Sequence, residues 1–98
     1  MVSSLDALAA RNNRADEGLL ALRKDLAQRT VTARDRGDLV EVEVDAGGKV
    51  LAVSVNSTLV RKVDAKTLAN AILQASTGAQ RAAAELVAQR RAYHLGRT

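Results

Sequence analysis

Residues 40–55 read VEVEVDAGGKVLAVSV, and their alternation of side chains is the clearest structural signal in the chain. Val40, Val42 and Val44 alternate with three acidic residues. A period of two places successive side chains on opposite faces of a strand. The pattern therefore predicts a strand with one apolar face and one solvated, acidic face.

A hairpin and a third strand extend this signal. The sequence Asp-Ala-Gly-Gly that follows predicts a hairpin loop, because glycine tolerates a positive φ. The return strand is expected to place Leu51, Val53 and Val55 on one face. A short β-favouring stretch, TVTA at 30–33, precedes a turn-forming DRGD sequence. Residues 30–56 are thus predicted to form a three-stranded antiparallel meander.

Helical periodicity flanks the predicted meander on both sides. Residues 1–29 carry an unbroken heptad seam, and residues 64–93 carry a second one with Asp64 as its N-cap. Tyr93 is expected to close the second seam, and the sequence leaves open whether Gly78 interrupts that helix. The residues expected in the core or the dimer contact are Leu19, Leu22, Leu26, Val40, Val42, Val44, Leu51, Val53, Val55, Leu68 and Ile72.

The composition predicts that two copies of the chain share their burial. The length of 98 residues has room for one domain, here taken as residues 1–98. Alanine accounts for 19 residues, there is no Phe or Trp, and Tyr93 is the single aromatic residue. Burial of apolar surface stabilises a fold by about 25 cal/mol per Å², and an alanine side chain contributes little apolar surface. A lone chain would leave its helical seams open, so a homodimer is expected.

Several functional classes are excluded or disfavoured by the residue types present. Without cysteine, and with His94 as the one histidine, the sequence predicts no metal site, no cofactor and no catalytic residue. Glu41, Glu43 and Asp45 could in principle hold a cation or serve acid–base chemistry, but a solvated strand face is the favoured interpretation. No small-molecule substrate, membrane span or secretory signal is evident, and a cytoplasmic, non-enzymatic protein is expected.

Basic residues are concentrated in the second half of the chain. Residues 1–49 carry a net charge of −1, whereas residues 50–98 carry a net charge of +5. Such a distribution favours an anionic partner, with nucleic acid the first candidate. A second basic cluster, formed by Arg61, Lys62 and Lys66, is ranked lower. The residues predicted to contact DNA are Arg11, Arg14, Arg81, Arg90, Arg91 and Arg97.

The order of these motifs resembles the YbaB/EbfC family of nucleoid-associated DNA-binding proteins. The resemblance is carried by GDLVEVEVD at 37–45, GKV at 48–50, VSVN at 53–56, STLV at 57–60 and the helix start at 64–72. The Asp-Pro pair of the family's junction is Asn-Ser here, and the chain has no proline. The methionine-rich segments common in the family are also missing.

The resemblance implies an α+β homodimer whose helices project as arms from a shared sheet. It also implies binding to double-stranded DNA in the nucleoid with little sequence preference, and an organising or gene-regulatory role. One alternative remains open: a protein-interaction module, such as a secretion-system adaptor, whose arginines serve only solubility.

Overall fold

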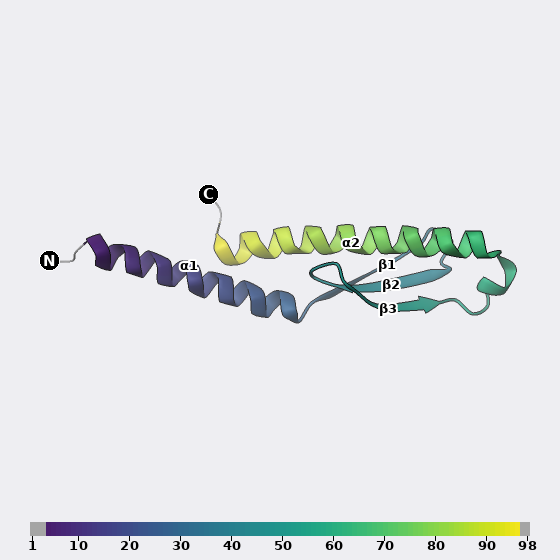
Figure 1. Ribbon diagram of the computed structural model, residues 1–98, viewed down its shortest axis with the longest axis horizontal. Helices are drawn as coiled ribbons and strands as arrows, with labels where there is room; N and C mark the ends of the chain where they lie inside the picture. Colours follow the sequence, from purple (N-terminus) through teal and green to yellow (C-terminus); the bar gives the residue numbers. More distant parts are fainter. Residues whose placement is uncertain (1–3, 97–98) are drawn as a thin grey trace.

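The computed structural model describes residues 4–96, with side chains from residue 16 onward. Its elements are α1 (Ser4–Ala27), β1 (Thr30–Arg34), β2 (Val40–Asp45), β3 (Val50–Val55), the 3₁₀ helix η1 (Val60–Lys62) and α2 (Ala65–Leu95). The sheet lies against the first half of α2, and α1 extends away from the sheet, past the other end of α2 (Figure 1). The predicted α+β class, with a meander between two long helices, is confirmed.

The three strands pair in the order β1-β2-β3, and both pairings are antiparallel. Val42 lies opposite Ala33 of β1 and Val53 of β3, so these three side chains share one face of the sheet. A register shift beside Val44 leaves Leu51 without a partner. This bulge interrupts the regular alternation that was expected through β3.

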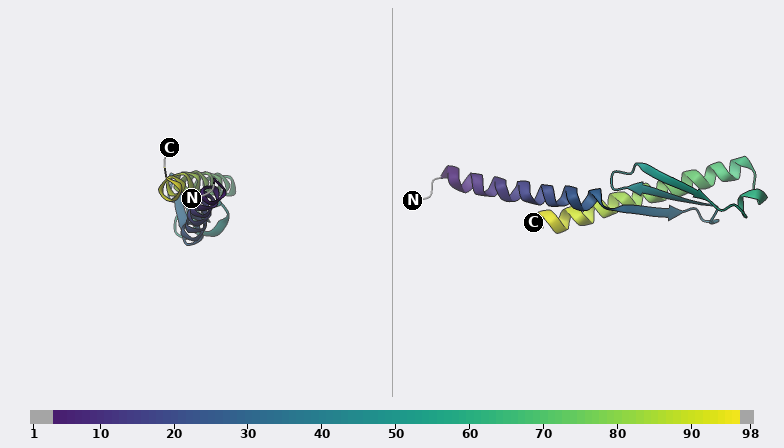
Figure 2. Two further views of the ribbon diagram at one scale, coloured as in Figure 1. Left: turned by 90° about the vertical axis from the view of Figure 1, so that its left-hand side faces the viewer. Right: turned by 90° about the horizontal axis from the view of Figure 1, so that it is seen from below.

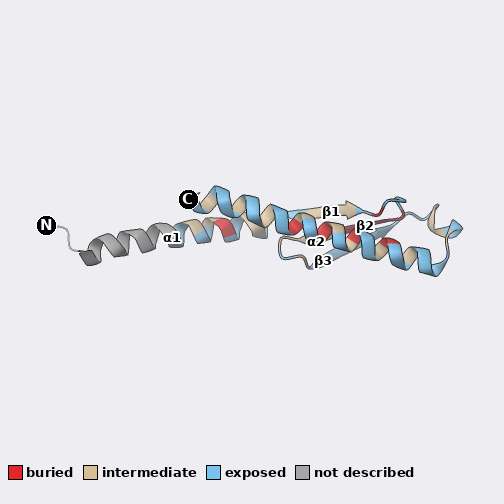
Figure 3. Ribbon diagram, turned by 90° about the horizontal axis from the view of Figure 1, so that it is seen from above, coloured by how far each residue is buried: buried red, intermediate tan, exposed pale blue. Residues whose placement is uncertain are grey.

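The core forms where α2 lies on β1 and β2. Small side chains let the helix approach the sheet closely, and a Cβ added to Gly78 would lie 3.5 Å from the Ala33 Cβ. The helix runs unbroken through Gly78. Leu68 and Ile72 are partly buried at the margin of this core. Figure 3 shows the buried positions along α2 and β2, which include Val40, Val42, Val44, Ala71, Ala75, Ala79 and Ala83.

Four of the residues expected in the core or in the dimer contact are exposed in the single chain. Leu51, Val53 and Val55 on β3 are 49%, 45% and 44% exposed, because α2 covers β1 and β2 and does not reach β3. Leu19 on α1 is 42% exposed. In the same helix Leu22 is buried and Leu26 is partly buried, near the region where α1 meets α2.

The expected heptad seam of α2 also needs correction. Its buried positions recur every four residues from Ala71 to Ala83, which is the row that faces the sheet. Tyr93 was expected to close the seam, but it is 71% exposed. The last turns of α2 extend past the sheet and meet α1 through Arg90 and His94, and the Tyr93 ring contacts these same two side chains.

The molecule is a rod. Its principal extents are 76 × 21 × 15 Å and its radius of gyration is 20.1 Å, compared with about 13 Å for a compact domain of similar length. The end-on view in Figure 2 shows how narrow the cross-section is. The length arises because α1 and α2 overlap only over their C-terminal parts.

Candidate nucleic-acid interface

The predicted DNA-contacting arginines divide into described and undescribed positions. Arg81 and Arg91 lie on α2 with exposed side chains, and neither makes an ion pair with another described residue. Arg11 and Arg14 belong to α1, but their side chains lie outside the described part of the chain, and Arg97 lies outside it altogether. Two cations are therefore displayed on α2, one beside the sheet and one beyond it.

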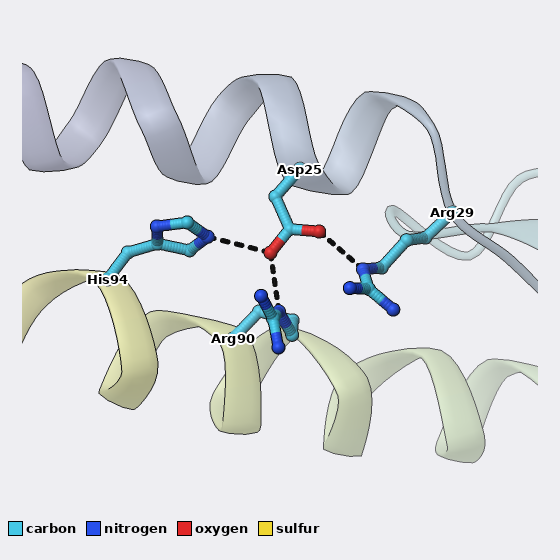
Figure 4. A network of polar contacts seen from close by, with 4 residues as sticks. All are labelled: Asp25, Arg29, Arg90 and His94. Carbon is cyan, nitrogen blue, oxygen red and sulfur yellow. Dashed lines mark hydrogen bonds and ion pairs between the residues drawn. The ribbon is translucent and has the colours of Figure 1, made fainter.

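Arg90 has a different environment, because it faces a carboxylate on α1. Its Nε donates to Asp25, which also accepts a hydrogen bond from the Nε of Arg29. The Nε2 of His94 lies 2.7 Å from the same carboxylate (Figure 4). Since an ionised carboxylate only accepts, the imidazole donates through Nε2. Arg90 thus joins the two helices and is less available to a ligand than Arg81 and Arg91.

The electrostatics of this network favour the ionised acid. The hydrogen bond from Arg29, followed by those from His94 and Arg90, holds the pKa of Asp25 well below its usual range, although burial opposes this shift. The Asp25 side chain is only 12% exposed. A partly buried carboxylate with three donors therefore fixes where α2 meets α1.

A close approach of the helices accompanies this network. A Cβ added to Gly18 would lie 3.0 Å from the Cδ2 of Leu95 and 3.3 Å from the carbonyl oxygen of His94. Glycine at this position lets the end of α2 rest against α1. Beyond Gly18, α1 continues past the end of α2 with no other described element beside it (Figure 1). This half of α1, which includes Arg11 and Arg14, is an arm.

The lower-ranked basic cluster lies where the chain passes from β3 into α2, at the end of the rod away from the α1 arm (Figure 1). Arg61 and Lys62 belong to η1 and Lys66 to the first turn of α2, and all three are exposed. Asp64 lies among them and caps α2 by accepting a 2.8 Å hydrogen bond from the Thr67 backbone nitrogen. Hydrogen bonds from Thr67 also lower the pKa of Asp64. A carboxylate within the cluster weakens its attraction for phosphate.

Sequence reasoning missed two features of this surface. Arg36, in the turn between β1 and β2, shares a depression with Arg81, although the two are far apart in sequence. The network of Asp25 was also missed, and its only sequence signal is the four-residue spacing between Asp25 and Arg29. Neither grouping can be derived from periodicity, because each depends on how α2 packs.

Two of the acidic side chains of β2 bond to side chains of the neighbouring strand β1. Glu41 pairs with Arg34 at 2.7 Å, and Glu43 accepts a 3.3 Å hydrogen bond from the Thr30 hydroxyl. Among the side chains that the structure describes, from residue 16 to residue 96, no group of three or more His, Cys, Asp or Glu is placed to hold a metal ion. Within the same residues, no helix is apolar enough over a sufficient length to cross a membrane.

Comparison with known proteins identifies the family. Residues 3–96 match the YbaB/EbfC DNA-binding family. The chain belongs to this family. It is 29% identical over 86 residues to a nucleoid-associated protein of Rhodococcus erythropolis, covering 88% of this chain and 77% of the relative. It is 28% identical over 71 residues to a nucleoid-associated protein of Desulfotalea psychrophila, covering 72% of this chain and 67% of the relative.

The YbaB/EbfC fold also appears in a solved structure. The crystal structure of an uncharacterized protein from Helicobacter pylori aligns with a TM-score of 0.74, covering 98% of this chain and all of the other. Sequence identity in that alignment is 14%, so the likeness concerns the fold alone. The resemblance inferred from the sequence motifs is confirmed by the family match.

Proposed function

We propose that this YbaB/EbfC protein binds double-stranded DNA as a homodimer, with little reading of base sequence, and acts in the cytoplasm at the nucleoid. The observation that carries the proposal is a pair of exposed arginines, Arg81 and Arg91, on a helix of a DNA-binding family fold. Neither forms an ion pair with a described residue. Guanidinium groups stay charged and donate in a fork that suits phosphate oxygens. An organising or regulatory role would follow from such binding.

The exposed surface of the single chain supports the homodimer. The chain exposes 7373 Å², compared with roughly 5,400 Å² for a compact monomer of its mass. Part of this excess is the apolar edge strand β3, where four residues are 44–49% exposed: Val50, Leu51, Val53 and Val55. An open, apolar strand edge is a surface on which another strand pairs. A second copy that pairs there would cover the valines and extend the sheet.

The chemistry of the surface supports phosphate contacts rather than base reading. Non-specific affinity for DNA comes from neutralising phosphates and releasing counterions. Tyr93, the one residue among Phe, Trp and Tyr, has the Arg90 guanidinium 4.4 Å from its ring centroid and makes a T-shaped contact with the His94 ring at 5.0 Å. A dimer carries twice the formal charge of +4 of one chain. We expect dissociation constants in the micromolar range that depend steeply on salt.

A titration of duplex DNA tests this proposal. Fluorescence anisotropy with two unrelated duplexes of equal length is measured between 50 and 200 mM salt, using protein whose dimer state has been checked by light scattering. We expect similar affinities for the two duplexes and a fall of at least about tenfold over this salt range. Absence of binding by folded wild-type protein, or binding that is insensitive to salt, would refute it.

A second candidate function is a protein-interaction module. A shallow depression of about 650 Å³ on the last half of α2 is lined mainly by apolar side chains, among them Ala84, Val87, Ala88 and Leu95. Such a surface can accept the apolar face of a partner helix. Failure of wild-type protein to bind any duplex would favour this function over DNA binding.

A further inference from the structure

A basic groove runs between α2 and the turn that joins β1 to β2. Its volume is about 510 Å³, and its lining includes Arg36 from the turn and Arg81 from α2. Asn70, Gln74 and Thr77 contribute polar side chains from the same side of α2. Three of these five residues can donate uncharged hydrogen bonds beside the two guanidinium groups.

The turn that carries Arg36 is held in place by a buried carboxylate. Asp35 is only 6% exposed, and it accepts hydrogen bonds from the backbone nitrogens of Gly37 at 3.1 Å and Val40 at 2.8 Å. The backbone nitrogen of Arg36 donates to the Oε1 of Gln74 at 2.7 Å. The turn is therefore fixed both internally and to α2, which keeps Arg36 on the same side as Arg81 before any ligand arrives.

The turn that carries Arg36 also holds Asp35 and Asp38, and neither acid forms an ion pair with a cation of the groove. Neither Arg36 nor Arg81 makes an ion pair with a described residue. Arg34 also borders the groove, but its Nε donates to Glu41 at 2.7 Å on the other face of the sheet. The carboxylate of Asp35 is engaged by backbone amides. The guanidinium groups of Arg36 and Arg81 are therefore available to a ligand.

We propose that this groove binds a backbone phosphate of double-stranded DNA, with Arg36 and Arg81 as its charged ligands. The inference rests on the proposed function and extends it by assigning a phosphate site at the β1 edge. Two guanidinium groups that line one groove, with neighbouring hydroxyl and amide donors, match the several acceptor oxygens of a phosphodiester. The groove lies beside β1, at the edge of the sheet opposite β3. A dimer that forms through β3 therefore leaves the groove open.

The test compares two double variants that remove the same charge. Arg36→Gln/Arg81→Gln removes both groove cations, and Arg61→Gln/Lys62→Gln removes two exposed cations of η1. Duplex binding is measured by anisotropy from 50 to 200 mM salt, with folding checked by circular dichroism and mass by light scattering. One lost contact in each groove of a dimer should make the slope of log K against log salt less steep by about 2. The groove variant should bind about tenfold more weakly than wild type, and the η1 variant should bind within about twofold of wild type.

The outcomes separate this inference from the proposed function. If wild-type protein binds duplex DNA and the two double variants lose affinity equally, only overall charge matters and the groove site is wrong. If the groove variant binds like wild type, the groove site is also wrong while DNA binding stands. If folded wild-type protein does not bind DNA, both the function and the groove site are refuted.

Discussion

Asp25 shows how one side chain can set the geometry of two helices. It accepts hydrogen bonds from Arg29 on its own helix and from Arg90 and His94 on α2 (Figure 4). These donors lower its pKa in the folded protein, so folding favours the charged carboxylate. The stabilisation it contributes is present above the ordinary aspartate pKa of about 3.9 and is lost as pH falls below that value.

The substitution Asp25→Asn should therefore lower stability at neutral pH and have less effect in acid. We expect a lower midpoint of thermal unfolding than wild type at pH 7, and a difference between the two midpoints that narrows as pH falls from 4 to 3. Circular dichroism melts at pH 7, 5, 4 and 3 measure both. Asp16→Asn, an exposed acid on the same helix, is the matched control and should follow the wild type. A constant difference at every pH would contradict the assigned role.

Asp35 supports the turn between β1 and β2, whereas Asp25 supports the contact between two helices. Removal of the Asp35 carboxylate should therefore affect the turn. Asp35→Ala leaves the backbone nitrogens of Gly37 and Val40 without their carboxylate acceptor. Loss of partners for buried polar groups costs about 1–3 kcal/mol in unfolding free energy. Urea denaturation should detect this loss. Asp38→Asn serves as an exposed control in the same turn, because asparagine tolerates the positive φ of 57° at this position. An unchanged midpoint for Asp35→Ala would show that the turn does not depend on this side chain.

The sequence predicts the character of these residues better than their roles. The turn at DRGD was expected, since its composition indicates one. The burial of Asp35 was not, because it depends on the chain folding back over the carboxylate. Arg81 and Arg90 share a charge and a helix, yet only Arg90 faces an acid on α1. Which arginine is structural depends on where α1 crosses α2, a property that single-helix periodicity does not contain.

At the scale of the element, α2 combines a close-packed half with a half that leaves the sheet. Ala71, Ala75, Ala79 and Ala83 form the buried row on the sheet side. The sequence predicts a long helix with an alanine-rich seam, and this is confirmed. Its heptad numbering differs from the buried row because a helix on a sheet buries a broader, differently placed stripe than a helix in a coiled coil.

Enlarging a residue of the buried row should therefore destabilise the protein by overpacking. Ala79 lies on the side of α2 that faces the sheet and is fully buried. We expect Ala79→Leu to lower the free energy of unfolding by about 1–3 kcal/mol. Ala69→Leu, at an exposed position of the same helix, should change it by less than about 0.5 kcal/mol. Urea denaturation of both variants gives the comparison, and equal effects would contradict the proposed packing.

The strands were predicted from the sequence, as α2 was, but two of their details were not. Alternation identified β2 and β3, because a period of two has no helical equivalent. The bulge at Leu51 and the exposure of Val53 were not predictable, since the first depends on pairing geometry and the second on the width that α2 covers. Contacts within one chain do not explain why β3 is apolar, so we expect a surface of another molecule to cover it.

At the scale of the whole molecule, the rod leaves two different margins along its sheet. The β1 margin carries Arg36 and Arg81 beside α2, and the β3 margin carries exposed valines and an unpaired strand edge. The two margins suit different partners, an anion at β1 and another copy of the chain at β3. Two copies joined at β3 would also bring two sets of arginines onto one body, which strengthens attraction to a polyanion.

A charge placed on the β3 margin should therefore separate the copies. We expect wild-type protein to have about twice the mass of its 10.4 kDa chain in light scattering, and Val53→Lys to shift toward the single-chain mass, because a lysine at a shared apolar edge is costly to bury. Thr32→Lys, an exposed position on β1, adds the same charge and should remain dimeric. Although Val53→Lys adds a positive charge, it should bind duplex DNA more weakly than Thr32→Lys, since two linked sets of arginines bind better than one. A Val53→Lys protein that is folded and still dimeric would exclude β3 as the dimer contact.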